Sequence, residues 1–168
     1  MAKLTREQEL ELSRNWKVRE DLRQDIINQM WDFWITITFP YIAGADSTER
    51  RIKEFFVNIN RYARCSIVDK RTHMFVCYEK HTTKKGAHAH LFVRGINPEN
   101  VELLQDLLNR KIGNSLVKAY DPHQGAAGYV AAKYDTPTFI FCKWLTLHPK
   151  TFKPFTPTNV DENYTVVI

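Results

Sequence analysis

The sequence EKHTTKKGAHAHLFV at residues 79–93 predicts two strands joined by a short basic turn. Side chains alternate between the two faces of an extended chain, so His88 and His90 point the same way, about 6.5 Å apart along the strand. Two imidazoles at this spacing can hold one cation. The same spacing also fits two half-exposed polar positions on a strand, so the His-x-His pair alone leaves both interpretations open.

The predicted partner strand brings a carboxylate to the same face. Residues opposite one another in an antiparallel pair project to one side of the sheet, and we expect Glu79 to lie opposite His90. The same register places His81 opposite His88. A slip by one residue would put Ala89 opposite Glu79 and abolish the cluster, whereas a slip by two would keep it. We therefore expect Glu79, His88 and His90 to bind a metal ion. His81 is either a fourth ligand or a solvated turn residue.

Length and composition indicate one globular domain with an anionic partner. The chain has 168 residues, enough for a single compact core. Its content of 43% hydrophobic and 12% aromatic residues argues against disorder. A net charge of +5 favours an anionic partner, and nucleic acid is the commonest one for such a domain. A basic surface that is only solvated explains the same charge.

Cysteine usage and the absence of long apolar runs indicate an intracellular protein. Cys65, Cys77 and Cys142 are odd in number and widely spaced, so they form neither a zinc motif nor a disulfide framework. The N-terminus is charged from Lys3 onward and lacks the apolar segment of a signal peptide. No apolar run is long enough to cross a bilayer, so we expect no membrane partner.

The clearest predicted strand is FWITITF at residues 33–39, which alternates, is rich in β-branched and aromatic residues, and stops at Pro40. It belongs in the middle of a sheet. Further strands are expected at residues 66–68, 73–79, 116–120 and 139–145, the last as an edge strand, and helices at 4–30, 48–63, 99–110 and 121–134. Together they predict an α+β fold, with a central antiparallel sheet of about five strands and flanking helices. The domain spans residues 31–148, with an N-terminal helix in residues 1–30 packing on it and an extended tail at 149–168.

The N-terminal helix is expected to be amphipathic. Thr5 and Gln8 form a capping pattern at its start. Its apolar positions recur near i, i+4 spacing: Leu12, Trp16, Leu22, Ile26 and Met30. Such a helix packs on the core or dimerises, and a contact of its basic face with DNA is the other interpretation.

The helix at residues 121–134 carries a second group of reactive side chains. Asp121 is a preferred N-cap, and a proline at the next position fits the first turn of a helix. Tyr129 and Lys133 are four residues apart and share a face, whereas Tyr134 is rotated by roughly 140° from Tyr129. A tyrosine that only packs at the helix surface, beside a solvated lysine, explains the same i, i+4 spacing.

Three motifs in this order resemble the HUH endonuclease superfamily, and most closely its rolling-circle replication initiator (Rep) proteins. The order is the strand at residues 34–39, then Glu79 nine residues before His88-Ala89-His90, then Tyr129-x-x-x-Lys133. The resemblance covers roughly residues 31–135 and implies a ferredoxin-like fold. The residue between the histidines is usually bulkier than Ala89 in this superfamily.

The resemblance implies that Glu79, His88 and His90 hold Mg²⁺ or Mn²⁺, and that Tyr129 is a nucleophile forming a 5′-phosphotyrosine link with DNA. Lys133 would lower the phenol pKa, neutralise charge on the phosphorane, or position the phosphate. Superfamily members with two tyrosines carry them one helical turn apart. Tyr134 lies five residues after Tyr129, so we expect it not to act as a nucleophile. The substrate implied is single-stranded or hairpin origin DNA, nicked to initiate rolling-circle replication.

Basic and aromatic residues are candidates for contacts with this DNA. Stacking on bases is expected from Trp34 or Tyr41. Phosphate contacts are expected from a larger set: Lys84, Lys85, Arg50, Arg51, Arg61, Arg64 and Arg94. The sequence contains no Gly-x-x-x-x-Gly-Lys motif, so unwinding is expected from a separate helicase or a missing C-terminal portion. A transposase or relaxase with the same chemistry remains open, as does a non-catalytic ferredoxin-like module with structural histidines.

Overall fold

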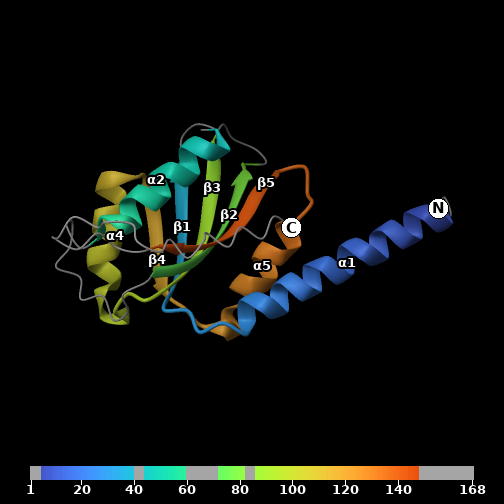
Figure 1. Cartoon of the computed structure of the whole chain (residues 1–168), viewed down its shortest axis with the longest axis horizontal. Coiled ribbons are helices and arrows are strands. Elements are labelled where there is room, and N and C mark those ends of the chain that lie inside the picture. Colours follow the sequence, from blue (N-terminus) through green and yellow to red (C-terminus); the bar gives the residue numbers. More distant parts are fainter. Residues whose placement is uncertain (1–4, 40–43, 60–71, 82–85, 148–168) are drawn as a thin grey trace, which may run out of the picture.

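A five-stranded antiparallel sheet forms the centre of the molecule (Figure 1). The computed structural model describes residues 5–39, 44–59, 72–81 and 86–147. The strand order is β4-β1-β3-β2-β5, and every neighbouring pair is antiparallel. The strands are β1 (Phe33–Phe39), β2 (Thr72–Lys80), β3 (Ala87–Arg94), β4 (Asn114–Ala119) and β5 (Phe139–Leu147). The expected α+β fold with about five strands is confirmed, and β5 is the edge strand that the sequence predicted.

Helices cover both faces of the sheet. They are α1 (Arg6–Ile27), α2 (Ala45–Val57), α4 (Val101–Lys111) and α5 (Ala126–Lys133), with short 3₁₀ turns η1 (Pro98–Asn100) and η2 (Pro122–Gln124). The order β1-α2-β2-β3-α4-β4 is the ferredoxin-like βαββαβ arrangement. One hydrophobic cluster joins the sheet to α2 and α4, and a second joins its other face to α1 and α5.

Strand β1 determines which side chains meet each helical layer. Its residues alternate between fully buried and half-buried positions, as its sequence pattern predicts. Phe33, Ile35, Ile37 and Phe39 belong to the cluster under α2 and α4. The other side chains of β1 point to the face that carries α1 and α5, and β1 lies between β3 and β4, so its expected interior position is confirmed.

The expected β2–β3 register is wrong by two residues. Glu79 lies opposite His88, and Cys77 lies opposite His90. The predicted register would close the hairpin with a two-residue Lys-Lys turn, and such turns need residues that tolerate positive φ. The chain instead places Gly86 at φ 125°, where His81 N–H donates to its carbonyl at 3.1 Å. A shift of two residues keeps every side chain on its face.

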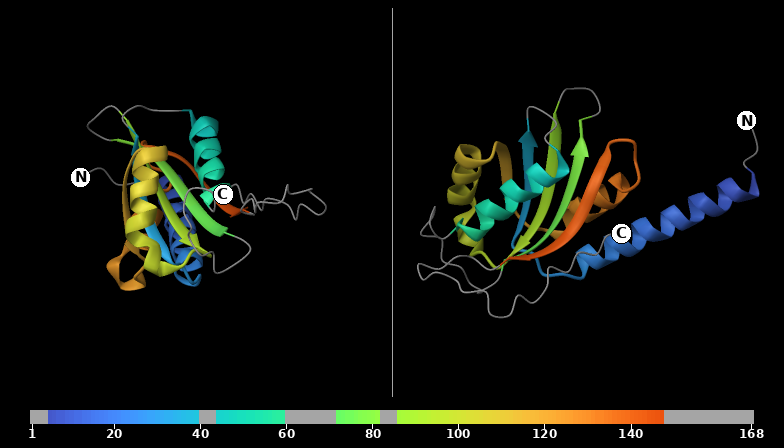
Figure 2. Two further views of the ribbon diagram at one scale, coloured as in Figure 1. Left: turned by 90° about the vertical axis from the view of Figure 1, so that its left-hand side faces the viewer. Right: turned by 45° about the horizontal axis from the view of Figure 1, so that its top comes forward.

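Helix α1 is shorter than expected, and its apolar stripe is only half used. It ends at Ile27, and the capping box of Thr5 and Gln8 is confirmed at its start. Leu22 and Ile26 are buried in the cluster with α5, whereas the stripe positions Leu12, Trp16 and Met30 are exposed. For Leu12 and Trp16 the reason is geometric, because the N-terminal half of α1 extends beyond the sheet (Figure 2), whereas Met30 follows the end of the helix.

Two other helix boundaries also differ from the expectation. Helix α2 begins at Ala45 rather than 48 and ends at Val57, with Gly44 as its N-cap. Asp121 caps η2 instead of a long helix, because its side chain accepts from His123 N–H. Gly125 then adopts φ 75°, which interrupts the helical path, and α5 starts after it. The strand expected at residues 66–68 and the tail at 149–168 lie outside the described residues.

Candidate functional site

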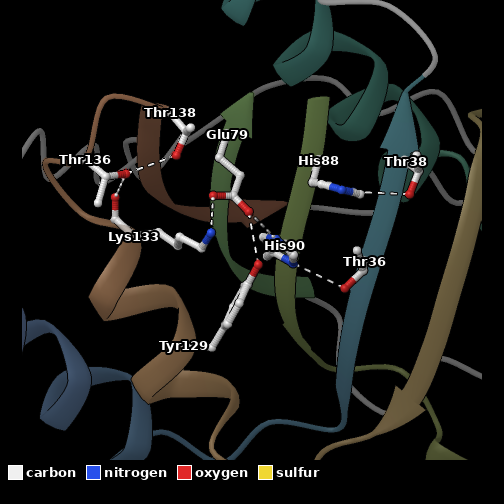
Figure 3. Close-up of polar contacts among 9 residues, drawn as sticks. All are labelled: Thr36, Thr38, Glu79, His88, His90, Tyr129, Lys133, Thr136 and Thr138. Carbon is white, nitrogen blue, oxygen red and sulfur yellow. Dashed lines mark hydrogen bonds and ion pairs between the residues drawn. The ribbon is translucent and has the colours of Figure 1, made fainter. Parts of the chain in front are cut away.

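Strands β2 and β3 and helix α5 bring together the side chains that the sequence singled out (Figure 3). Glu79 comes from β2, and His88 and His90 come from β3. Tyr129 and Lys133 occupy successive turns of α5. All of them lie on the sheet face that carries α1 and α5.

Glu79 is the centre of this cluster. Its side chain is 3% exposed, and its Oε1 atom lies 3.1 Å from His90 Nε2. Tyr129 donates its hydroxyl to the same oxygen at 3.2 Å. Oε2 lies 3.2 Å from Lys133 Nζ. One buried carboxylate therefore contacts an imidazole, a phenol and an ammonium group.

These contacts keep Glu79 ionised. Burial raises its pKa, but the hydrogen bonds and charges of His90 and Lys133 outweigh burial and lower the pKa to about 2. Lys133 shows the converse balance: burial lowers its pKa, whereas Glu79 and Tyr129 raise it, with a net increase. The pair is therefore charged on both sides at neutral pH.

Two threonines orient the histidine rings, and sequence reasoning missed both. Thr36 Oγ1 lies 3.2 Å from His90 Nδ1, and Thr38 Oγ1 lies 3.2 Å from His88 Nδ1. The β1–β3 register places each threonine directly opposite its histidine. With Nδ1 occupied, Nε2 is the atom that each ring offers to a ligand. Trp34 stacks on the His90 ring, with centroids 5.2 Å apart and planes 4° from parallel.

The donor set fits a divalent cation, although its atoms are not gathered around one point. One carboxylate and two imidazoles suit Mn²⁺ and related ions. Within the described residues, however, no group of three or more His, Cys, Asp or Glu side chains is arranged to hold a metal ion. Glu79 and His90 bond to each other, and the His88 ring centroid lies 5.8 Å from that of His90. Metal binding would require Glu79 to exchange its hydrogen bonds for coordination.

His81 contacts His88 rather than Glu79. The two ring centroids are 3.7 Å apart. Burial, followed by the charges of His81 and His90, lowers the pKa of His88 to about 4. His88 is therefore neutral at physiological pH, which is the form that binds metals.

Tyr129 is accessible but is not activated in this arrangement. Its side chain borders solvent, with 45% of the residue exposed. Burial and the neighbouring Glu79 raise the phenol pKa, and the opposing effect of Lys133, whose Nζ lies 5.0 Å from the ring centroid, is smaller. Lys133 therefore lowers the phenol pKa, but by less than burial and Glu79 raise it. Tyr134 lies apart from the site, with its ring against Phe139.

A pocket of about 320 Å³ opens beside Tyr129. Trp34, Thr36 and His90 form its floor on the sheet, and η2 and the start of α5 form its wall. Lys118 of β4 and Gln124 of η2 also line it, and sequence reasoning missed both. Lys118 lies opposite Trp34 in the β1–β4 register, so only the long-range pairing reveals it. The pocket combines an aromatic surface, an amide and a cation next to the phenol.

The structure does not bring all the predicted DNA contacts to this site. Arg50 and Arg51 lie on α2, over the opposite face of the sheet, and Arg51 donates to the Ile112 carbonyl at 3.1 Å. Arg94 lies at the other end of β3. The remaining candidates lie outside the described residues: Tyr41, Arg61, Arg64, Lys84 and Lys85.

Comparison with known proteins adds no relatives. No family model, curated protein or solved structure matches the chain. None of the described helices combines the length and the apolar character that a bilayer crossing requires. The site and the sequence motifs therefore carry the inference of function.

Proposed function

We propose that this protein is a metal-dependent single-stranded DNA nickase and strand-transferase that initiates rolling-circle replication. The observation that carries the proposal is the contact of Glu79 with both His90 and Tyr129. A candidate metal ligand and a candidate nucleophile share one carboxylate oxygen, so a phosphate held at the histidines would lie beside the phenol. The ordered motifs that resemble the HUH superfamily support the same reaction.

In the proposed reaction Tyr129 Oη attacks a DNA phosphorus atom. The new bond joins the tyrosine oxygen to phosphorus as the phenol loses its proton. The bond from phosphorus to the 3′ oxygen breaks, and that oxygen gains a proton and leaves as a hydroxyl. The phosphodiester energy is kept in the tyrosine link, so the reverse reaction can join strands. A divalent cation held by Glu79, His88 and His90 would act as a Lewis acid on the phosphate.

The chain's own side chains supply the other parts of the reaction. Lys133 places a cation beside the phenol, where it can offset negative charge that develops on the phosphate. The pocket beside Tyr129 offers Trp34 for stacking on a base and Lys118 for a phosphate. These features suit an unpaired strand, because a stacked base requires an open face. A separate helicase would supply single-stranded DNA.

One observation favours a second candidate, a nucleic-acid-binding module without catalysis. Glu79, His90, Tyr129 and Lys133 contact one another, and the phenol pKa is raised. Such a network also suits a purely structural role, in which it holds α5 against the sheet. Binding of single strands without covalent chemistry would then be the activity.

Formation of a covalent adduct tests the proposal. A labelled single-stranded oligonucleotide with an origin hairpin is incubated with the protein and Mn²⁺, and adducts are resolved on a denaturing gel. We expect the wild type to form the adduct and Tyr129→Phe to form none. Tyr134→Phe is the matched control, because it makes the same change at the end of α5 away from Glu79, and it should retain activity.

The possible outcomes separate the candidates. If the wild type binds hairpin substrates but forms no adduct with any of them, the non-catalytic module is correct. An adduct that persists in Tyr129→Phe would show that another residue is the nucleophile. Loss of the adduct in Tyr134→Phe alone would contradict the assignment of a single tyrosine. Omission of Mn²⁺ and Mg²⁺ should abolish the wild-type adduct.

A further inference from the structure

A second pocket, of about 240 Å³, lies at the other end of the sheet. It is lined on the sheet by residues of β2, β3 and β5, and on its outer side by Gln29 and Trp31, which follow α1. His73 of β2 lies opposite Arg94 of β3 and next to Thr146 of β5. This row forms the polar side of the pocket. None of the candidate catalytic side chains lines it.

Tryptophan rings form the apolar side of the pocket. Trp31 and Trp144 are stacked, with ring centroids 5.8 Å apart and planes 25° from parallel. Phe75 supports Trp144 from the sheet, with centroids 4.8 Å apart. Trp31 is held in place by its Nε1–H, which donates to the Ile26 carbonyl at 2.8 Å. Trp144 is half-buried and is one of the residues that line the pocket.

The polar side carries a cation that no described carboxylate neutralises. Arg94 is exposed and makes no hydrogen bond or ion pair within the described residues. His73 Nδ1 is engaged by Thr146 Oγ1 at 3.2 Å. No Asp or Glu is among the described residues that line the pocket. A guanidinium beside an aromatic wall, without a carboxylate, is complementary to an aromatic ligand that carries an anionic group.

We propose that this pocket binds one unpaired nucleotide, with its base against Trp144 and its phosphate on Arg94. Base stacking on tryptophan needs no sequence-specific contact, and arginine binds phosphate oxygens in a fork. The nucleotide comes either from free mononucleotide or from the DNA strand. Arg94 is four residues from His90 on the same face of β3, about 13 Å away. A strand held at Tyr129 can span that distance, and this source depends on the proposed function.

Binding of small ligands to the full chain in EDTA tests the pocket itself. Affinities for 5′-dTMP, thymidine and deoxyribose 5-phosphate are measured by NMR titration. We expect 5′-dTMP to bind most tightly of the three ligands. Arg94→Gln should lower the affinity for 5′-dTMP about tenfold, to the affinity for thymidine. Trp144→Leu should weaken 5′-dTMP to the level of deoxyribose 5-phosphate, with circular dichroism verifying the fold. Arg14→Gln, which removes an exposed arginine from α1, is the matched control and should bind normally.

Cross-linking identifies the source of the nucleotide. The Tyr129→Phe protein, which cannot cut, is irradiated with oligonucleotides that carry 5-iododeoxyuridine at successive positions, and the cross-linked peptides are mapped. A cross-link to Trp144 from one position identifies the DNA strand as the source. Binding of 5′-dTMP at Arg94 without any such cross-link identifies a free nucleotide.

Failure of this inference differs from failure of the proposed function. If Arg94→Gln leaves 5′-dTMP affinity unchanged, or if neither 5′-dTMP nor any oligonucleotide occupies the pocket, the nucleotide site does not exist, even where the wild type forms a covalent adduct. If 5′-dTMP binds through Arg94 and Trp144 while no adduct forms, the site stands and the nickase proposal fails.

Discussion

At the scale of single residues, Thr36 and Thr38 are the contacts that orient the candidate metal ligands. Each hydroxyl bonds one histidine Nδ1 at 3.2 Å. Loss of such an outer contact typically lowers metal affinity by about 10 to 100-fold. We expect Thr36→Val and Thr38→Val each to weaken Mn²⁺ binding by about tenfold while the fold is kept, since valine matches threonine in shape. Electron paramagnetic resonance of free Mn²⁺ measures this affinity directly.

Thr48→Val provides the matched control for both variants. Thr48 is buried on α2, over the opposite face of the sheet, and its hydroxyl has no hydrogen-bond partner within the described residues. The same change there should leave Mn²⁺ affinity unaltered. If Thr36→Val and Thr38→Val bind Mn²⁺ like the wild type, the threonine contacts do not position the histidines for metal binding.

The separate motifs of the candidate site could be predicted at this scale, because the residues within each motif are local in sequence. The His-x-His pair lies on one strand, and Tyr129 and Lys133 lie one helical turn apart. Thr36 and Lys118 could not be predicted in the same way. Their place depends on which strands pair with β1, and the sequence of a strand does not specify its partners.

At the scale of elements, Gly125 determines where α5 begins. Its φ of 75° lies in the left-handed region, and its carbonyl accepts from Tyr129 N–H at 2.9 Å as the first bond of the helix. A Cβ added there would meet no atom within 4 Å, so only backbone strain opposes substitution. Gly125→Ala should therefore lower the free energy of unfolding by about 1 kcal/mol, measured by urea denaturation.

Gly44→Ala separates strain from the general effect of losing a glycine. Gly44 also has open space around it, but its φ of −58° suits any residue. We expect Gly44→Ala to change stability by only a few tenths of a kcal/mol, because the loss of a favoured N-cap residue and the lower entropy of the unfolded chain oppose each other. Equal losses in the two variants would show that the left-handed conformation of Gly125 is not the cause.

Element boundaries and register were the least predictable features, for identifiable reasons. Asp121 followed by proline is a genuine cap, but it caps a 3₁₀ turn that Gly125 ends. The β2–β3 register follows from where Gly86 can sit, and a side-chain pattern with a period of two cannot distinguish registers two residues apart. The bounds of β1 were predictable to the residue, because its side chains alternate between the core under α2 and α4 and the face that carries α1 and α5.

At the scale of the whole molecule, the fold class followed from the alternation of strand and helix patterns. Burial and a few ion pairs hold the layers of this fold together. One of these joins the helical layer to the edge strand. Lys143 of β5 lies 2.7 Å from Glu49 Oε2, and Lys53 of α2 lies 2.7 Å from Glu49 Oε1. Burial raises the pKa of Glu49, but the two lysines outweigh it, so the pKa lies below its ordinary value.

This shift predicts how global stability depends on pH. A carboxyl group with a lowered pKa in the fold stabilises the protein above its unfolded pKa, and the contribution is lost as pH falls through the lower, folded value. Glu49→Gln should therefore cost roughly 0.5–1 kcal/mol at pH 7, because the ion pairs are partly screened by solvent. The difference in the free energy of unfolding between Glu49→Gln and wild type should shrink as pH falls below about 4, near the pH at which glutamate normally titrates. Urea denaturation of both proteins at pH 7 and pH 3 measures the two differences.

Glu54→Gln on the same helix is the control, because Glu54 is exposed. It should change stability by no more than a few tenths of a kcal/mol at either pH. A cost of Glu49→Gln that is equal at pH 7 and pH 3 would mean that lost packing, rather than lost charge, destabilises the variant. A cost that vanishes at pH 3 and falls with added salt at pH 7 would assign the attachment of α2 to β5 to its electrostatic contacts.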